Sequence, residues 1–384
     1  MKENSTGRVG GTEVSKQAQQ RLQALVAARR RGEQAEARLT VGLDIGDRSS
    51  SYCVLDEAGE VMERGRTATD RQALTTLFSQ LPAGTVALEV GGHSPWISRL
   101  LKQLGHDPVV ANAREVELIT RNSRKNDRLD AELLARLARA DRKLLSPVEH
   151  RSGQAQADLM GVRVRAHLVE VRTATVSAVR GLVKSWGERL PKCDADTLGR
   201  RHAAGLPEAV RGHAERLLEL VEELTEKIAA CDREIEEVSR RRYRKETAQL
   251  QQVKGVGPVT ALTFVLTLGD PHRFGKSRDA GAYLGLAPKS SQSGNSEPEM
   301  QISKEGDVYL RALLVQCSQY ILSRRGPDTD LKRWGLGIAG KGRKKAKNRA
   351  VVAVARKLAV LLHSLWVSGE RYEPLRQAQA RAAA

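Results

Sequence analysis

Two acidic residues lie in stretches that predict buried β-strands, where a carboxylate is unusual. Asp44 falls in the alternating run Thr40-Val41-Gly42-Leu43-Asp44-Ile45-Gly46, which has the period of a strand buried on at least one face. Burying an unpaired carboxylate is costly, and the glycines on either side of Asp44 clear space around it. Glu89 repeats the arrangement, because Val86, Leu88 and Val90 take one face while Glu89 lies among small residues on the other. The Asp44 stretch alone favours a satisfied buried carboxylate, or one at a strand end, over a cation ligand.

A second pair of acids begins a helix. Asp127 and Asp130, in the run Lys125-Asn126-Asp127-Arg128-Leu129-Asp130-Ala131, are spaced i, i+3 and share a helical face. The alternative is that Asp127 caps the helix and Asp130 complements its dipole. Two acids on strands and two on one helix nevertheless make a set of oxygen ligands. Such a set suits a pair of Mg²⁺ ions that polarise a phosphate and activate a nucleophile.

The elements that must position these acids alternate between strands and helices from Thr40 to about residue 140. The pattern predicts a hairpin over 51–55 and from 61 onward, a helix through Leu74 and Phe78, a strand at 86–90, a helix at 95–104 and a short strand at 108–110. This order is typical of an α/β unit.

Two long helices are expected next. Residues 152–186 read as one helix in which Arg165 and Arg172 are a heptad apart, so they form either a solvated basic face or a phosphate-contacting face. After a break at 187–205, apolar residues recur from Val210 to Val238 with alternating spacings of four and three. This heptad seam predicts a coiled coil, packed either within its own protomer or between protomers.

The carboxyl-terminal part holds the other candidate contacts to nucleic acid. The turn at 253–258 with Lys254, Gly255 and Gly257 precedes an apolar helix at 259–268, and it is either a phosphate-binding turn of helix-hairpin-helix type or a plain turn. Residues 289–299 are rich in Ser, Gly and Pro, which indicates a flexible loop, and a helix is expected from Tyr309 to Leu322. Eight basic residues without an acid then lead into an apolar stripe and predict a phosphate-binding helix: Lys341, Arg343, Lys344, Lys345, Lys347, Arg349, Arg356 and Lys357.

Composition narrows the class of protein. The 384 residues carry a net charge of +18, so a polyanion, by default nucleic acid, is the expected partner. Aromatic residues are 3% of the chain, too few for a base-stacking platform, which favours binding by charge and shape. The four dispersed cysteines exclude a zinc ribbon and a disulfide framework and indicate a reducing cytoplasm. No signal peptide, 18-residue apolar span or membrane partner is expected, and residues 1–38 read as a loosely ordered basic arm with a helix through Leu22, Leu25 and Val26.

Taken together, these motifs resemble the insertion-sequence transposases with a DEDD RuvC-like domain, a family that includes Piv-type DNA invertases and bridge-RNA-guided recombinases. The resemblance runs from about Thr40 to Leu362. Its motifs, in order, are Gly42-Leu43-Asp44-Ile45-Gly46, Glu89 with a following glycine, Lys125-x-Asp127-x-x-Asp130-Ala131, Gly255-Val256-Gly257-Pro258-Val259-Thr260-Ala261, Arg273-Phe274, Tyr283-x-Gly285-Leu286-Ala287-Pro288, Ser293-Gly294, Ile302-Ser303-Lys304-x-Gly306 and Leu310-Arg311.

The resemblance implies a RuvC-like RNase H fold in which Asp44, Glu89, Asp127 and Asp130 are the catalytic metal ligands, with Mg²⁺ bound and Mn²⁺ as an alternative. It also implies a catalytic serine, which maps to Ser293, with Ser290 and Ser291 as alternatives if the register shifts. The expected partners are double-stranded donor and target DNA, an element-encoded bridge RNA, and further protomers in a dimer or tetramer. Lys304, beside the serine loop, joins the expected nucleic-acid contacts.

Domain boundaries follow from these assignments. We expect a basic arm over 1–38, a DEDD catalytic domain over 39–150, a long helix and coiled coil over 151–248, a mainly helical transposase domain over 249–370 and a tail over 371–384. The chain departs from the family pattern at Val90-Gly91-Gly92-His93-Ser94, at Asp307 and in its long arm. Two other classes stay open: a Holliday-junction-type metal-dependent nuclease, and a nucleic-acid-binding protein without catalysis.

Overall fold

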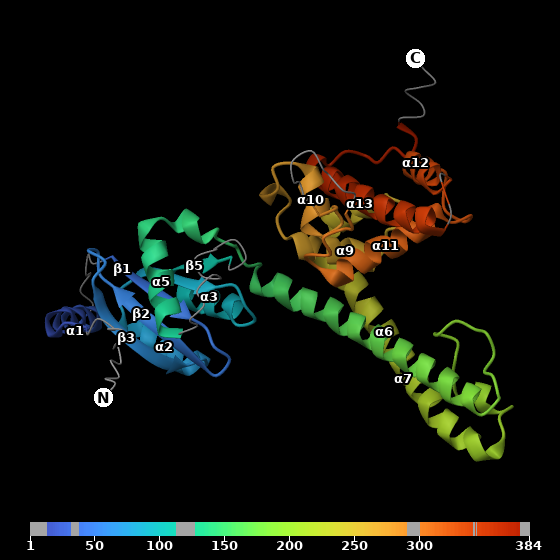
Figure 1. Cartoon of the computed structure of the whole chain (residues 1–384), viewed down its shortest axis with the longest axis horizontal. Helices are drawn as coiled ribbons and strands as arrows, with labels where there is room; N and C mark the ends of the chain where they lie inside the picture. Colours follow the sequence, from blue (N-terminus) through green and yellow to red (C-terminus); the bar gives the residue numbers. More distant parts are fainter. Residues whose placement is uncertain are drawn as a thin grey trace, which may run out of the picture. The chain divides into compact units, whose positions relative to one another are not determined.

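A computed structural model of the protein describes residues 14–31, 38–112, 127–289, 300–340, 342 and 344–376, with only the backbone for 127–129 and 344. The chain forms two compact units, Met1–Arg151 and Ser152–Ala384 (Figure 1). The first unit contains the sheet and the second is helical, so each is described separately.

The first unit is built on a five-stranded sheet in the order β3-β2-β1-β4-β5. The strands are β1 (Leu39–Asp44), β2 (Ser49–Leu55), β3 (Val61–Ala68), β4 (Gly84–Glu89) and β5 (Asp107–Ala111). β1, β2 and β3 pair antiparallel, which confirms the predicted hairpin, whereas β1, β4 and β5 pair in parallel. This mixed α/β arrangement is compatible with an RNase H-like domain.

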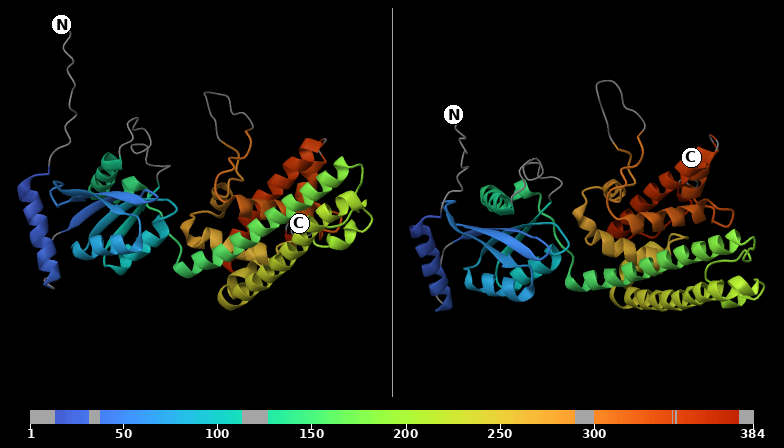
Figure 2. Two further views of the ribbon diagram at one scale, coloured as in Figure 1. Left: turned by 90° about the horizontal axis from the view of Figure 1, so that it is seen from below. Right: turned by 60° about the horizontal axis from the view of Figure 1, so that its bottom comes forward.

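Helices cover both faces of this sheet. α2 (Arg71–Gln80) and α3 (Ser94–Gln103) pack on the side chains of Val41 and Leu43, while α5 (Asp127–Ala140) lies on the opposite face (Figure 2). Alternate residues of β1 point to opposite faces, so Gly42 and Asp44 face α5. The predicted alternation of strands and helices is confirmed.

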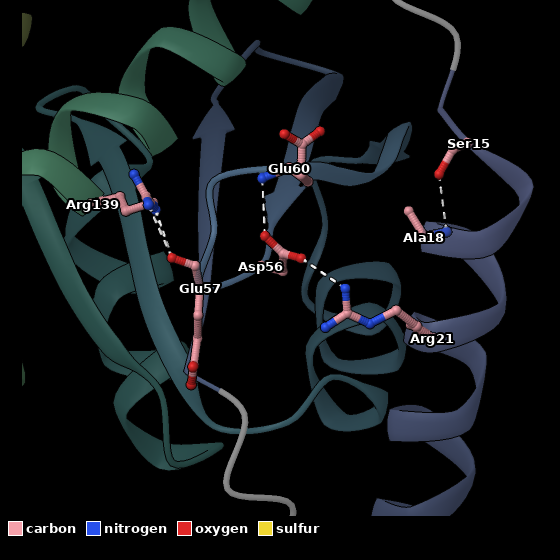
Figure 3. Close-up of polar contacts among 7 residues, drawn as sticks. All are labelled: Ser15, Ala18, Arg21, Asp56, Glu57, Glu60 and Arg139. Carbon is pink, nitrogen blue, oxygen red and sulfur yellow. Dashed lines mark hydrogen bonds and ion pairs between the residues drawn. The ribbon is translucent and has the colours of Figure 1, made fainter.

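Residues 14–31 form part of this unit instead of a loose arm. α1 (Lys16–Arg30) begins at Ser15, whose hydroxyl accepts a hydrogen bond from the Ala18 amide at 3.1 Å. Leu22 is buried in the sheet's core, so the expected helix is confirmed. Arg21 donates to the buried carboxylate of Asp56 over 3.3 Å, which ties the helix to the turn after β2 (Figure 3). Apolar burial and this ion pair explain why the segment is ordered despite its basic composition.

The second unit contains a long antiparallel hairpin of two helices, α6 (Gly153–Ser185) and α7 (Glu208–Arg242). The heptad seam of α7 packs on α6 of the same chain, with Val221, Leu224 and Ile228 buried. Of the two interpretations of the seam, the structure therefore favours packing within the protomer.

The rest of the second unit packs around one central helix, α13. Its helices are α8 (Arg244–Gln251), α9 (Pro258–Leu268), α10 (Ser277–Tyr283), α11 (Val308–Leu322), α12 (Asp330–Ala339) and α13 (Lys344–Ser368). Residues 345–368 are long and apolar enough to cross a membrane, so the expectation that no such span exists is wrong. Val354, Leu358 and Leu362 of this helix are fully buried among the neighbouring helices. The helix is therefore apolar because it lies in the core of the second unit.

All four cysteines are free thiols. Burial raises the pKa of Cys53 to about 11 and also raises that of Cys317, so both are protonated and pack as small apolar groups. The expected absence of a disulfide framework is confirmed.

Candidate active site

Two of the predicted acids lie side by side at one edge of the sheet. Asp44 is the last residue of β1 and Glu89 the last of β4. The two strands run parallel, and Leu43 is in register with Leu88, so the two acids follow at the same level. Both side chains are half-buried.

A glycine brings the helical acids to the same edge. A Cβ at Gly42 would lie 1.8 Å from the Ala131 carbonyl oxygen and 2.7 Å from the Ala135 amide nitrogen, so the backbone of α5 rests directly on β1. Ala131 and Ala135 are small and fully buried, which permits this approach. Asp130 precedes Ala131 and is half-buried, and the backbone of Asp127 forms the first turn of α5, whereas its side chain lies outside the described part. The start of α5 thus lies near the ends of β1 and β4.

This edge has the donor chemistry for a divalent cation. Carboxylate oxygens are the ligands that hard cations such as Mg²⁺ prefer. Asp44, Glu89 and Asp130 each interact with other groups of the protein. Among the described side chains, no group of three or more His, Cys, Asp and Glu is close enough to hold a metal, and the fourth acid is not among them. The donor type suits a divalent metal, but Asp44, Glu89 and Asp130 are not grouped closely enough in the described structure to hold one.

An ion-pair network that the sequence did not reveal fixes α5 against the hairpin. Glu132 accepts from Arg64 of β3 at 2.5 Å and from Arg136 at 2.9 Å. Burial alone would raise the pKa of Glu132, but the two guanidinium groups outweigh it and lower that pKa. The i, i+4 spacing of Glu132 and Arg136 is visible in the sequence, whereas Arg64 is 68 residues away. The network holds the helix that carries the acids.

The segment after Glu89, where the chain departs from the family pattern, is tied to the loop after Asp44. His93 Nε2 lies 3.5 Å from Asp47 Oδ1. Trp96 Nε1–H donates to His93 Nδ1 at 3.1 Å, and because an indole can only donate, the ring proton of neutral His93 lies on Nε2. These contacts link the loops that follow the two acid-bearing strands, and sequence reasoning assigned them no role.

The two arginines predicted to form one face of the long helix are engaged inside the second unit. Arg165 donates to Asp232 of α7 at 2.8 Å and to the Tyr309 hydroxyl at 3.3 Å. Arg172 donates to Thr225 of α7 at 3.2 Å. Both residues therefore brace α6 against its neighbours. These contacts give both arginines partners within the second unit, and a phosphate contact by either stays a prediction.

The glycine turn joins α8 to α9 as expected. Lys254, Gly255 and Gly257 are exposed, while Val256 is buried. Gly255 has φ of 103° and packs closely on Tyr320, so its conformation requires glycine. The turn is fixed in shape and accessible, and a phosphate contact there stays a prediction.

The serine segment is anchored at both ends, although Ser290, Ser291 and Ser293 lie outside the described residues. Lys289 donates its backbone N–H to Gln301 at 3.0 Å, and Ser303 donates to Ala287 at 2.9 Å. Next to these two hydrogen bonds, the backbone at Gly285 lies against the backbone at Glu305, because a Cβ at Gly285 would lie 2.2 Å from the Glu305 carbonyl oxygen. The resemblance motifs on either side of the segment thus form one rigid base.

Basic side chains gather beside this base. Lys345 and Arg349, in the first turns of α13, are exposed and line one groove with Lys304, whose φ of 59° is unusual for a residue with a side chain. Lys347, in the same turns of α13, is also exposed. Lys341 and Arg343 are outside the described residues, and only the backbone of Lys344 is described.

A cavity of about 660 Å³ in the first unit lies at the opposite edge of the sheet from the acids. It is lined by Leu39 and Thr40 at the start of β1 and by Gly84 and Thr85 at the start of β4. Its position excludes it as part of the acid site.

Comparison with known proteins agrees with this arrangement. A model of DEDD transposases of the IS110 group matches residues 41–186, and a model described as the IS116/IS110/IS902 transposase family matches residues 247–332. A putative transposase of Sinorhizobium fredii is 31% identical over 331 residues, covering 83% of this chain and 81% of its own length. The transposase of insertion sequence element IS1111A from Coxiella burnetii is 29% identical, covering 86% and 90% respectively. A probable family 20 transposase of Pseudomonas aeruginosa is 29% identical, covering 87% and 98%.

The sheet, the acid-bearing edge and these matches define an insertion-sequence DNA transposase with a DEDD domain, an enzyme class that depends on divalent metal ions. The chain belongs to the IS116/IS110/IS902 transposase family.

Proposed function

We propose that this transposase cuts and rejoins DNA through a serine nucleophile, Ser293, beside a Mg²⁺ site formed by its four acids. The observation that carries the proposal is the placement of Asp44, Glu89 and the start of α5 at the same edge of the sheet. The paired backbone that flanks residues 290–299 supports it, since a nucleophile must be presented from a fixed support.

The chemistry requires both parts of the chain. Asp44, Glu89, Asp127 and Asp130 would hold Mg²⁺, or Mn²⁺ in its place, and the bound cation supplies positive charge for the phosphoryl oxygens. Ser293 Oγ bonds to phosphorus, the bond from phosphorus to one strand breaks, and the released oxygen leaves as a hydroxyl. The phosphoserine link conserves the phosphodiester, so a hydroxyl of another strand can reverse the step and rejoin DNA.

Ser293 needs a partner from elsewhere in the assembly. A serine hydroxyl is a weak nucleophile at neutral pH, and residues 289–299 contain no histidine. We therefore propose a composite site in which the serine segment meets the four acids of its own or another protomer.

An element-encoded RNA would choose the donor and target sites, since the protein's exposed basic side chains suit phosphates and aromatic residues are scarce. Double-stranded DNA and this RNA are the proposed partners, and the cytoplasm the proposed compartment.

Protomer contact is the third part of the proposal, with a dimer or tetramer as the active form. Three large apolar residues of α6, Met160, Val164 and Leu182, and Trp186 at its carboxyl-terminal cap are 50–62% exposed. At 100° per residue they fall within an arc of roughly 80° on one helical face. Because the seam of α7 is already covered, this face of α6 is the better candidate for contact between protomers.

Complementation between inactive variants tests the proposal. Ser293→Ala and Asp44→Ala proteins should each fail to form a covalent adduct with DNA, and mixed assemblies should recover it if the site is shared between protomers. Adduct formation by Ser293→Ala itself would refute the assignment and point to Ser290 or Ser291. Strand cleavage without any adduct in the wild type would instead identify a metal-dependent nuclease.

A further inference from the structure

A groove of about 1190 Å³ lies in the second unit beside the base of the serine segment. The amino-terminal half of α13 forms one wall, and Trp334 of α12 contributes to the lining. Lys289 and Met300, on either side of residues 290–299, also line it. The volume exceeds the about 300–1,000 Å³ of small-molecule pockets. The groove therefore suits a piece of an extended ligand better than a metabolite.

The charge of the groove specifies a polyanion. Its lining includes six basic residues and no acidic one: Lys289, Lys304, Lys345, Arg349, Arg356 and Lys357. The base of the serine segment fixes the first two on one side, and α13 carries the other four. Such a uniform field attracts a phosphate backbone.

The floor of the same groove is apolar. Leu286, Ile302 and Val352 line it, and Trp334 and Met300 are 40% and 41% exposed. Lys357 Nζ lies 4.3 Å from the centre of the Trp334 ring, which places a cation against an aromatic face. A duplex turns its phosphates outward and keeps its bases stacked, so it would leave this floor uncovered. Unpaired nucleotides carry phosphates and also expose base faces, and they match both features.

We propose that this groove binds an unpaired stretch of a nucleic-acid strand, with phosphates on the basic rim and bases on the apolar floor. The proposal rests on the proposed function, since it places such a strand beside the segment that carries Ser293. Single-stranded DNA and unpaired RNA share this chemistry, so the test includes both.

The test measures binding of full-length protein to fluorescent oligonucleotides by anisotropy. The probes are oligo-dT and oligo-U of about 12 nucleotides and a DNA duplex of the same length. Trp334→Ala should weaken binding of at least one single strand about tenfold or more, while duplex affinity stays within about twofold. Leu336→Ala is the matched control, because Leu336 is on the same helix, 46% exposed and outside the groove lining.

A second variant separates the groove from the integrity of α12. Ala353→Glu adds a carboxylate to the groove from α13, a different helix, and should weaken single-strand binding at least as much. Thermal unfolding of each variant confirms that the protein is folded. A loss confined to oligo-dT assigns DNA to the groove, and a loss confined to oligo-U assigns RNA.

Two results would overturn the proposal. One is an equal loss of affinity for duplex and single strands, which would show that the groove contacts phosphates only. The other is unchanged single-strand affinity in both variants. Failure of the proposed function is distinguishable, because it appears in the wild type as the absence of a covalent DNA adduct. Failure of the groove appears only in the variants.

Discussion

Gly42→Ala should damage the active site from a residue that has no functional group. Its Cβ would lie 1.8 Å from the Ala131 carbonyl oxygen, whereas ordinary contact begins at 3.4 Å, so α5 must move away by roughly 1.6 Å. Overpacking of this kind costs about 1–3 kcal/mol of stability. Because Asp130 lies in the same turn as Ala131, the acid moves with the helix, and a misplacement of about 1 Å can cost about 100-fold in rate. We expect at least that loss in covalent adduct formation.

Gly92→Ala is the matched control, since a Cβ there has no heavy atom within 4 Å. It should leave adduct formation and thermal unfolding unchanged. The obstacle at Gly42 is a backbone carbonyl, so Ala131→Gly should not rescue Gly42→Ala. A Gly42→Ala protein with wild-type stability and activity would show that α5 does not rest on β1, and the positioning of the acids by this contact would be refuted.

Three further predictions follow from the contacts described above. Asp127→Ala and Asp130→Ala should each abolish adduct formation with little change in melting temperature if they are metal ligands; a role at the helix start instead predicts a loss of roughly 1 kcal/mol and retained activity. Asp141→Ala, which removes a cap on the Lys143 amide, is the control that should lower stability and keep activity. Without RNA, the protein should bind duplexes with little regard to sequence, and its affinity should fall by about 0.9 log units per log unit of salt for each phosphate neutralised; strong sequence discrimination by RNA-free protein would contradict this. Arg165→Gln should lower stability by about 1–3 kcal/mol and leave that salt slope unchanged, because its guanidinium is engaged by Asp232; a shallower slope would restore it as a phosphate contact.

The sequence predicted the elements well where the pattern is local. The alternation around Val41 and Leu43 and the heptads of α7 follow from side chains that a strand or helix must bury. Partners distant in the chain were not predictable: Arg165 looked like a surface cation until Asp232, 67 residues away, was placed beside it. The seat of α5 on Gly42 is likewise a tertiary contact that no local pattern encodes.

Two expectations failed because packing decided the outcome. The segment around Leu22 is basic and short of apolar residues, yet one buried leucine and the Arg21–Asp56 pair are among the contacts that dock it on the sheet. The expectation of no 18-residue apolar span failed at residues 345–368, whereas the predicted helix with an apolar stripe is confirmed there, since Val354 and Leu358 are buried against neighbouring helices. The serine segment itself lies outside the described residues, so its nucleophile stays a prediction.

The length of the helical hairpin in the second unit is set by the number of residues in its two helices. At 1.5 Å per residue, α6 and α7 each extend about 50 Å, and the chain returns close to its starting point. One apolar cluster, with Leu159 and Ile235, joins its root to α9, and another, with Val183 and Leu218, closes its tip. Removing one heptad from each helix between these clusters would shorten the hairpin by about 10 Å and keep the apolar clusters at its two ends intact. The length of this hairpin can therefore change in steps of one heptad, in evolution or by design, without changes to the sheet or to the helical core.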